Sequence, residues 1–275
     1  MKIKEIIKAF SDIGSEEPER EAYLTVEHLF NVNYASALAE PLREYDNGEL
    51  DRVLSERRNK IPLQYIFGEW YFMGERFLVS RDCLIPRQDT EILVENAVNV
   101  IKKGGRIADL CTGSGCIGIS VLINRQDITD LTLVDISEGA LRMARKNAEL
   151  HGLSERCTFI LEDVTKVLPD GKFDAILSNP PYIPSRDMDT LSDEVKNEPK
   201  IALDGGAEGL DIIKTLVYNC SALLNSGGCL MIEFGYDQKE SMTRLLDGAL
   251  KEGLYSRYEF RYDYGGNIRM CYVVK

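Results

Sequence analysis

The chain of 275 residues has no apolar run that approaches the roughly 18 residues of a membrane span. Its first residues are charged and lead into an amphipathic stretch, which is not the pattern of a secretory signal peptide. It contains no internal repeat and no low-complexity segment. These absences favour a cytoplasmic globular protein that has no membrane partner.

The cysteines do not have the spacing that is typical of disulfide-bonded or metal-binding cysteines. The seven residues are an odd number and include no C-x-x-C pair, so neither a disulfide framework nor a zinc site is indicated. We therefore expect no metal, and we expect reduced thiols that are mostly buried. The cysteines are Cys83, Cys111, Cys116, Cys157, Cys220, Cys229 and Cys271.

Positive charge is in deficit. Lys and Arg number 33 against 45 Asp and Glu, which gives a formal net charge of −12. Such a protein repels phosphate backbones overall, so a dedicated binder of duplex DNA is disfavoured and no direct nucleic-acid partner is expected. A basic protein partner or a cationic ligand suits this charge better.

The first sixty residues form a region of their own. Ile3, Ile6 and Phe10 fall at helical spacing, and Pro18 suits the first turn of a second helix. Further helices are expected near 35–40 and 50–58. We predict a small helical bundle over 1–60. It contains no catalytic constellation, so a stabilising module and a substrate-docking domain both remain open.

The rest of the chain predicts an α/β fold. Residues 61–87 form a linker with a β-hairpin, whose turn we place at 74–75. Over 88–275, apolar strand segments alternate with helical ones, which indicates a Rossmann-like, mostly parallel sheet. The expected strands are 107–110, 131–134, 158–161, 175–177 and 229–233; the clearest helices are 91–102, 118–123 and 137–151.

A glycine-rich motif follows the first strand of that sheet. Residues 109–118 contain G-x-G-x-x-G, and Asp135 ends the next strand, where a carboxylate can bind ribose hydroxyls. Dinucleotides and S-adenosylmethionine both fit this pattern. Asp109 favours the latter, because a carboxylate suits a cationic amino group better than a pyrophosphate. After the third strand, Asp163 and Val164 are a candidate adenine contact.

The tetrapeptide Asn-Pro-Pro-Tyr at 179–182 follows the fourth strand. Two consecutive prolines donate no backbone hydrogen bond, so the strand must end at Asn179. The Asn179 side-chain oxygen and the Pro180 carbonyl are two acceptors suited to a planar NH2 group, and Tyr182 can stack on it. Such a nitrogen is a poor nucleophile, so acceptors at both N–H groups would favour its attack.

Here the chain resembles the class I S-adenosylmethionine-dependent methyltransferases that carry an Asn-Pro-Pro-Tyr motif and methylate adenine, guanine or glutamine nitrogens. Four further stretches narrow the resemblance to the HemK/PrmC family of glutamine methyltransferases. They are Gln-Tyr-Ile-Phe-Gly at 64–68, Leu-Ile-Pro-Arg-Gln-Asp-Thr-Glu at 84–91, the segment 197–211 with its Asp-Gly-Gly, and Glu-Phe-Gly at 233–235 with Gln238.

The resemblance implies a Rossmann-like methyltransferase domain behind a helical N-terminal domain. The implied cofactor is S-adenosyl-L-methionine, with S-adenosyl-L-homocysteine as product. The implied substrate is the glutamine of the Gly-Gly-Gln motif in class 1 peptide chain release factors, the proteins of translation termination. A ribosomal-protein glutamine or, less readily, a nucleic-acid amino group remains an alternative substrate.

The candidate site residues come from the motifs together with the resemblance. Expected cofactor contacts are Asp109, Cys111, Thr112, Gly113, Ser114, Gly115, Asp135, Asp163, Val164 and Asn179. Expected substrate contacts are Asn179, Pro180, Pro181, Tyr182, Arg87 and Glu91, and the catalytic candidates are Asn179, Pro180 and Tyr182. Two positions depart from the family: Cys111 stands where glycine is usual, and Gln88-Asp89 where Pro-Glu is usual.

Overall fold

The computed structural model describes residues 1–102 and 104–275. The chain divides into two compact units, which we describe separately. The first comprises Met1–Gly68 together with Ser192–Asn197, and the second comprises Glu69–Leu191 together with Glu198–Lys275. None of the helices in these described ranges is long and apolar enough to cross a membrane.

The first unit is helical, as predicted. Its core is formed by side chains at helical spacing, among them Ile6, Phe10 and Val26, which are fully buried. The Asn33 and Asp46 side chains cap two of the helices by accepting backbone N–H groups. The helices are α1 (Ile3–Asp12), α2 (Pro18–Phe30), α3 (Tyr34–Ala39), α4 (Asn47–Arg58) and α5 (Leu63–Phe67).

A buried arginine joins the distant segment Ser192–Asn197 to these helices. The Arg57 guanidinium is almost fully buried and donates to both carboxylate oxygens of Glu21, at 2.6 and 3.1 Å. It also donates to Glu194 Oε1 at 2.5 Å. A cation can be buried only when it is paired and hydrogen-bonded, so these contacts fix the segment that follows the Asn-Pro-Pro-Tyr region in the sequence.

The second unit contains a seven-stranded sheet in the order β5-β4-β3-β6-β7-β9-β8. The strands β5, β4, β3, β6 and β7 pair in parallel, and β9 is antiparallel to both β7 and β8. This confirms the predicted Rossmann-like sheet; the hairpin of β8 and β9 was not anticipated. The strands are β3 (Arg106–Leu110), β4 (Asp130–Asp135), β5 (Cys157–Leu161), β6 (Phe173–Ser178), β7 (Leu224–Glu233), β8 (Arg257–Tyr262) and β9 (Ile268–Val274).

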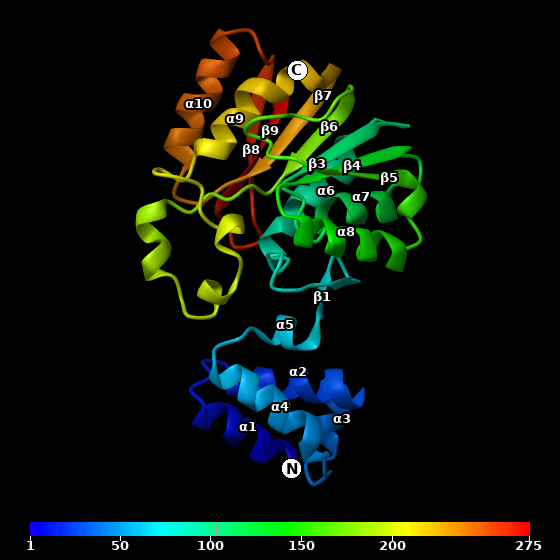
Figure 1. The fold of residues 1–275 in the computed structure, drawn as a ribbon, viewed down its shortest axis with the longest axis vertical. Helices are drawn as coiled ribbons and strands as arrows, with labels where there is room; N and C mark the ends of the chain where they lie inside the picture. Colours follow the sequence, from blue (N-terminus) through cyan, green and yellow to red (C-terminus); the bar gives the residue numbers. More distant parts are fainter. Residues whose placement is uncertain (103) are drawn as a thin grey trace. The chain divides into compact units, whose positions relative to one another are not determined.

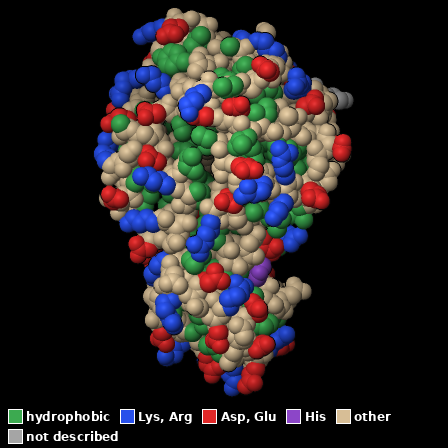
Figure 2. Space-filling view, viewed as in Figure 1, with side chains coloured by type: hydrophobic (Ala, Val, Ile, Leu, Met, Phe, Trp, Pro, Cys, Tyr) green, Lys and Arg blue, Asp and Glu red, His purple; other side chains and the backbone are tan. Residues whose placement is uncertain are grey.

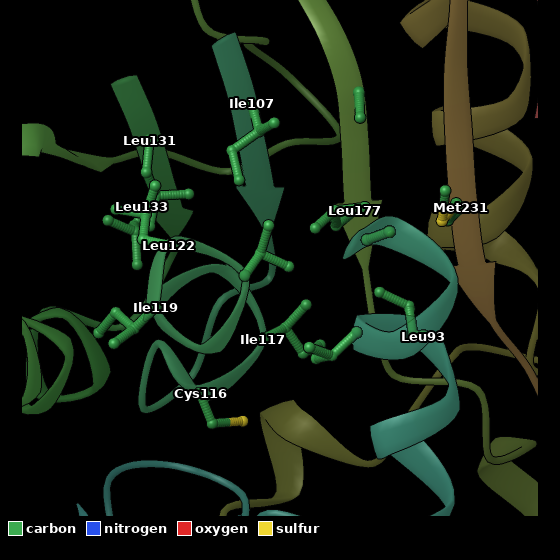
Figure 3. Close-up of a cluster of buried hydrophobic side chains, with 14 of the residues drawn as sticks. Leu93, Ile107, Cys116, Ile117, Ile119, Leu122, Leu131, Leu133, Leu177 and Met231 are labelled. Carbon is green, nitrogen blue, oxygen red and sulfur yellow. The ribbon is translucent and has the colours of Figure 1, made fainter. Parts of the chain in front are cut away.

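Helices cover both faces of this sheet (Figure 1). Helices α6 (Glu91–Val100), α7 (Cys116–Asn124) and α8 (Glu138–Leu150) pack on one face, and α9 (Asp211–Asn219) and α10 (Lys239–Lys251) on the other. Figure 3 shows the first of these cores, where strand side chains meet α6 and α7. Labelled there are Leu93, Ile107, Cys116, Ile117, Ile119, Leu122, Leu131, Leu133, Leu177 and Met231.

A β-hairpin precedes the sheet, with strands β1 (Glu69–Phe72) and β2 (Glu75–Leu78). Its turn residues are Met73 and Gly74, with φ of 53° and 76°. Two consecutive left-handed residues match the twist of a two-residue hairpin, so the turn lies one residue earlier than predicted. Short 3-10 helices complete the unit: η1 (Gln88–Thr90), η2 (Ser154–Arg156), η3 (Ser185–Thr190), η5 (Lys200–Ala202) and η6 (Cys220–Leu223); η4 (Val195–Asn197) belongs to the first unit.

The strand order places a topological switch between β3 and β6. The chain runs outward from β3 through β4 to β5, and then returns to the other side of β3 at β6. The first helix after β3 (α7) and the first α-helix after β6 (α9) lie on opposite faces of the sheet, so a crevice opens at the carboxyl ends of these two strands. The glycine motif follows β3 and Asn179 follows β6, which brings both motifs to this crevice.

Candidate active site

A cavity of about 300 Å³ lies at these strand ends, at the lower end of the range for ligand pockets. All of its lining residues belong to the second unit. Ten of the predicted site residues line it: Arg87, Cys111, Thr112, Gly113, Ser114, Asp135, Asp163, Val164, Asn179 and Pro181. Five do not: Asp109, Gly115, Pro180, Tyr182 and Glu91.

The glycine loop is fixed by hydrogen bonds to the neighbouring strand. The Gly113 N–H donates to Asp135 Oδ2 at 2.8 Å, and the Thr112 N–H donates to the Val134 carbonyl at 3.1 Å. Asp135 Oδ1 accepts from the Ser137 N–H at 2.9 Å. Burial raises the pKa of Asp135, although these backbone donors oppose that rise. Each of its oxygens keeps lone pairs that can accept from a ligand hydroxyl.

Asp109 lies beneath this loop rather than in the cavity. Its side chain is fully buried, and Oδ2 accepts from Thr112 Oγ1 at 2.6 Å and from the Gly118 N–H at 3.0 Å. Oδ1 has no hydrogen-bond partner among the residues described on either side of position 103. Desolvation raises the pKa of Asp109 to about 7. In this structure the carboxylate therefore braces the loop and the start of α7.

Asp163 and Val164 follow β5 and line the cavity. The Asp163 carboxylate accepts from the hydroxyl of Thr165 at 2.6 Å and from its N–H at 3.0 Å, and pairs with Lys166 at 2.9 Å. These donors lower the pKa of Asp163 to about 2. The side chain thus forms a local turn, and the buried Val164 offers an apolar wall to a ligand.

The tetrapeptide 179–182 is held from two sides. Asn179 Nδ2 donates to Thr90 Oγ1 at 3.1 Å, which leaves Oδ1 as the end of the amide available to a ligand. Further on, Gln238 Nε2 donates to the Tyr182 carbonyl at 2.9 Å, and Gln238 Oε1 accepts from the Gly235 N–H at 2.8 Å. The motif at 233–238 therefore supports the backbone of the tetrapeptide, through Gln238.

The two side chains expected at the wall of the site have separate structural roles. Arg87 lines the cavity and is paired with the buried carboxylate of Glu198, which also accepts from the Ile85 N–H at 3.1 Å. Glu91 points elsewhere, since its Oε1 accepts from the Met73 N–H at 2.7 Å. Arg87 is thus placed to face a ligand, whereas Glu91 connects α6 to the hairpin.

Three side chains that support the candidate site are not among the residues expected from the sequence. Thr90 lines the cavity and holds Asn179, and Glu233 is buried at the end of β7 although its motif had been noted. Asn147 is fully buried on α8; its amide exchanges hydrogen bonds with Leu78 and donates to the Ser114 carbonyl at 2.8 Å. Only tertiary structure brings these residues to the site, since each acts on a distant segment.

Both departures from the family motifs are accommodated locally. Cys111 has a φ of 59°, in the left-handed region where glycine is favoured, so the backbone keeps a glycine-like shape despite the side chain. Burial raises the pKa of its thiol, which makes it a poor nucleophile. Asp89 pairs with Arg269 at 3.2 Å.

The side chains that line this cavity fit a cofactor that contains a nucleoside and a sulfonium group. The Asp135 carboxylate suits ribose hydroxyls, the apolar Val164 and Ile136 suit a flat base, and the acceptor oxygens carry negative charge that suits a cation. No cationic side chain of the described residues lines the cavity except Arg87, and that charge is neutralised by Glu198. A pyrophosphate would lack a counter-charge here.

Comparisons with known proteins agree with this geometry. The PrmC N-terminal domain family matches residues 3–68, and the methyltransferase small domain family matches residues 88–198. A release factor glutamine methyltransferase of Moorella thermoacetica is 35% identical over 274 residues, which cover 98% of this chain and 95% of that protein.

Two further similarities bear on fold and substrate. A ribosomal protein uL3 glutamine methyltransferase of Francisella tularensis is 38% identical over 193 residues, covering 69% of this chain and 61% of that protein. A putative rRNA methylase structure from Clostridium thermocellum aligns with a TM-score of 0.51 at 16% identity, over 70% of this chain and 100% of that one, which supports the fold alone. On the full-length similarity and both domain matches, the chain belongs to the HemK/PrmC family of protein-glutamine methyltransferases.

Proposed function

We propose that this enzyme transfers a methyl group from S-adenosylmethionine to the side-chain amide nitrogen of the glutamine in the Gly-Gly-Gln motif of class 1 release factors. One observation carries the proposal: Asn179 lines the same cavity as Asp135 and the glycine loop, with its amide nitrogen turned to Thr90. A hydrogen-bond acceptor for an amide N–H thus lies beside a nucleoside site.

The cofactor would be held by the residues at the ends of β3, β4 and β5. Asp135 would accept from ribose hydroxyls, and Val164 with Ile136 would enclose the adenine. The loop 111–115 would allow close backbone approach to the remaining part of the molecule. When bound, S-adenosylmethionine supplies an electrophilic methyl group.

The substrate glutamine would be held by the tetrapeptide. Its two amide N–H groups would donate to Oδ1 of Asn179, which lines the cavity, and to the carbonyl of Pro180, the next residue, which does not line it. Pro181 has no backbone N–H that would compete for a nearby acceptor. Acceptance at both bonds increases electron density on nitrogen and fixes its direction of attack. The neutral nitrogen attacks with its own lone pair, so no base is required before transfer. After it has gained the methyl group, the nitrogen would release one proton to solvent.

Tyr182 would assist from the edge of the site. It is partly buried and packs against the core under α9 and α10, and desolvation raises its pKa far above the ordinary value. The ring therefore stays neutral at all working pH values, which suits a stacking surface for a planar amide.

The release factor is preferred over ribosomal protein uL3 as substrate because of the helical unit. The match to the PrmC N-terminal domain covers residues 3–68, whereas the uL3 methyltransferase is similar over 193 residues only. A nucleic-acid substrate is disfavoured by the net charge of −12. On the face shown in Figure 2, basic and acidic side chains are interspersed rather than gathered into a basic surface.

A substrate panel tests this proposal. The enzyme is incubated with labelled S-adenosylmethionine and, separately, a Gly-Gly-Gln release factor, ribosomal protein uL3, tRNA and duplex DNA. We expect label in the release factor alone, and none when its glutamine is replaced by glutamate. Transfer to uL3 or to nucleic acid, with none to the release factor, would overturn the assignment.

A further inference from the structure

A buried carboxyl group lies next to the Asn179 side chain. Strands β6 and β7 are parallel neighbours, and Ser178 pairs with Ile232, so Asn179 and Glu233 follow at adjacent positions. Glu233 is only 2% exposed, and its Oε2 has no hydrogen-bond partner among the described residues. It does not line the cavity. An unsatisfied buried carboxyl oxygen is costly and calls for a functional explanation.

Thr90 connects the two side chains. Its hydroxyl oxygen accepts from Asn179 Nδ2, so the hydroxyl proton remains to be donated. Thr90 is only 2% exposed, so bulk water is not its acceptor, and the unpartnered carboxylate oxygen of the buried Glu233 is a suitable one. The register of β6 and β7 puts Asn179 beside Glu233, and the side chains of Thr90 and Asn179 both oppose the rise in the Glu233 pKa, which means that they favour its ionised form.

The direction of these donors decides which end of the amide faces the ligand. An ionised Glu233 can only accept, so it draws the Thr90 proton toward itself and leaves the Thr90 oxygen free to accept from Asn179 Nδ2. If the amide were reversed, its oxygen would lie toward the carboxylate and its NH2 toward the cavity. That arrangement would be repelled by Glu233 and could not accept from a glutamine N–H.

We propose that Glu233 is a positioning residue that, through the Thr90 hydroxyl, holds the Asn179 amide with its oxygen toward the cavity. The substrate end of this inference rests on the proposed function, because the amide orientation matters for a substrate that donates N–H groups. Glu233 itself touches neither substrate nor cofactor.

The charged surroundings of Glu233 set the pH range of this effect. Desolvation raises its pKa to about 7, while Arg269 opposes the rise and Asp89 adds to it. Tyr182 and Cys116 also interact electrostatically with it, and burial raises the pKa of both, so both stay neutral near pH 7. Protonation of Glu233 would turn an acceptor into a donor and allow the amide to reverse. Catalysis should therefore decline as the pH falls through about 7.

The first test is kinetic and uses three substitutions. Glu233→Gln keeps the shape but supplies an NH2 group, and Thr90→Val removes the hydroxyl, whereas Thr90→Ser keeps it. We expect the first two to lower kcat by roughly 10- to 100-fold, with little change in the dissociation constant for S-adenosylmethionine, and Thr90→Ser to stay near wild type. Glu233→Gln should also lose the acidic limb of the kcat profile.

A control on the neighbouring strand separates positioning from the general loss of a hydrogen-bonded carboxylate. Asp174 lies at the opposite end of β6 and accepts from the Arg106 N–H and from Asn225 Nδ2, each at 2.9 Å. Asp174→Asn is expected to leave kcat and its pH profile unchanged. A Glu233→Gln enzyme with kcat within twofold of wild type, or with the acidic limb intact, would contradict the proposal.

The second test needs no substrate. In ¹⁵N-labelled protein, the Asn179 NH2 resonance is assigned by its loss in Asn179→Asp and followed from pH 5.5 to 8.5. We expect it to titrate with a midpoint near 7 in wild type, and this transition to vanish in Glu233→Gln. A resonance that titrates identically in both proteins would overturn the positioning role. Failure of wild type to methylate a release factor would overturn the proposed function alone and leave this result valid.

Discussion

At the scale of single residues, Asn179 joins the two parts of the candidate active site. It directly follows β6, lines the cavity proposed to hold the cofactor, and belongs to the motif expected to hold the substrate amide. Its position could be predicted from the sequence, because two prolines must end a strand and strand ends carry ligands in open α/β sheets. Its hydrogen-bond partner Thr90 and its neighbour Glu233 could not, because they are 89 and 54 residues away in the sequence and leave no local pattern.

The first prediction concerns Asn179 itself. Replacing it with alanine removes the acceptor for the substrate N–H but keeps Asp135 and the glycine loop. We expect kcat to fall by about 100-fold or more, since one preorganised donor or acceptor typically contributes that much. Binding of S-adenosylmethionine, followed by isothermal titration calorimetry, should remain measurable. Near-normal turnover in this variant would rule out the acceptor role.

The second prediction concerns stability and pH. Folding raises the Glu233 pKa from 4.5 to about 7, so between these values the folded protein binds more protons than the unfolded chain. The free energy of unfolding therefore falls as pH rises through this range, by about 3 kcal/mol for this group.

Glu233→Gln removes this titration. Urea unfolding at pH 5.5 and at pH 8 should show a smaller loss of stability in the variant than in wild type. The fully buried Asp109, whose pKa is also raised to about 7, remains in both proteins and contributes equally. If the free energy of unfolding changed equally between pH 5.5 and pH 8 in wild type and variant, ionisation of Glu233 would not destabilise the folded protein.

At the scale of helices and strands, the alternation of strand-like and helix-like segments in the sequence was sufficient to predict the parallel part of the central sheet. The apolar runs at 107–110 and 131–134 became β3 and β4, because buried parallel strands need apolar side chains on both faces. The hairpin of β8 and β9 was missed although aromatic residues recur at Tyr258, Phe260 and Tyr262, a period of two. No recognised motif drew attention to that segment.

A glycine on α7 provides a prediction at this scale. A Cβ atom on Gly118 would lie 2.7 and 3.0 Å from the methyl carbons of Leu131 and 3.1 Å from Asp109 Cβ. Gly118→Ala should therefore push α7 from β3 and β4, cost roughly 1–3 kcal/mol and weaken S-adenosylmethionine binding. Thermal unfolding and calorimetry measure both effects.

Gly48 on α4 is the matched control, because a Cβ there would meet no atom within 4 Å. Gly48→Ala should leave stability unchanged or slightly higher, as alanine favours helix. Equal behaviour of the two variants would remove the packing argument for Gly118.

At the scale of the whole molecule, the proposal divides recognition between the two units. The second unit contains the cavity, and the first is proposed as the docking domain for an intact release factor. The first unit exposes Leu38 and Leu42, at 56% and 75%, on and just after α3. Exposed leucines close in sequence are suitable contacts for a protein partner. The sequence left this docking role open, because a helical bundle with no polar constellation fits a stabilising module equally well.

Leu38→Lys and Leu42→Lys test this division. Together they should raise KM for an intact release factor about tenfold, the equivalent of 1.4 kcal/mol, and leave KM for a short Gly-Gly-Gln peptide unchanged. Leu150→Lys, on α8 of the second unit, is the control for an added surface charge. Equal effects on factor and peptide would count against docking by the first unit.

The central claim is that the methyl group is placed on one glutamine nitrogen, and tandem mass spectrometry of the modified release factor tests it most directly. The full-length enzyme is incubated with S-adenosylmethionine and an unmodified class 1 release factor, and the peptide that contains Gly-Gly-Gln is fragmented. The account predicts a gain of one methyl group confined to the side-chain amide of that glutamine, and no gain with Asn179→Ala. A methyl group on any other residue, or an unmodified peptide after complete incubation, would contradict it.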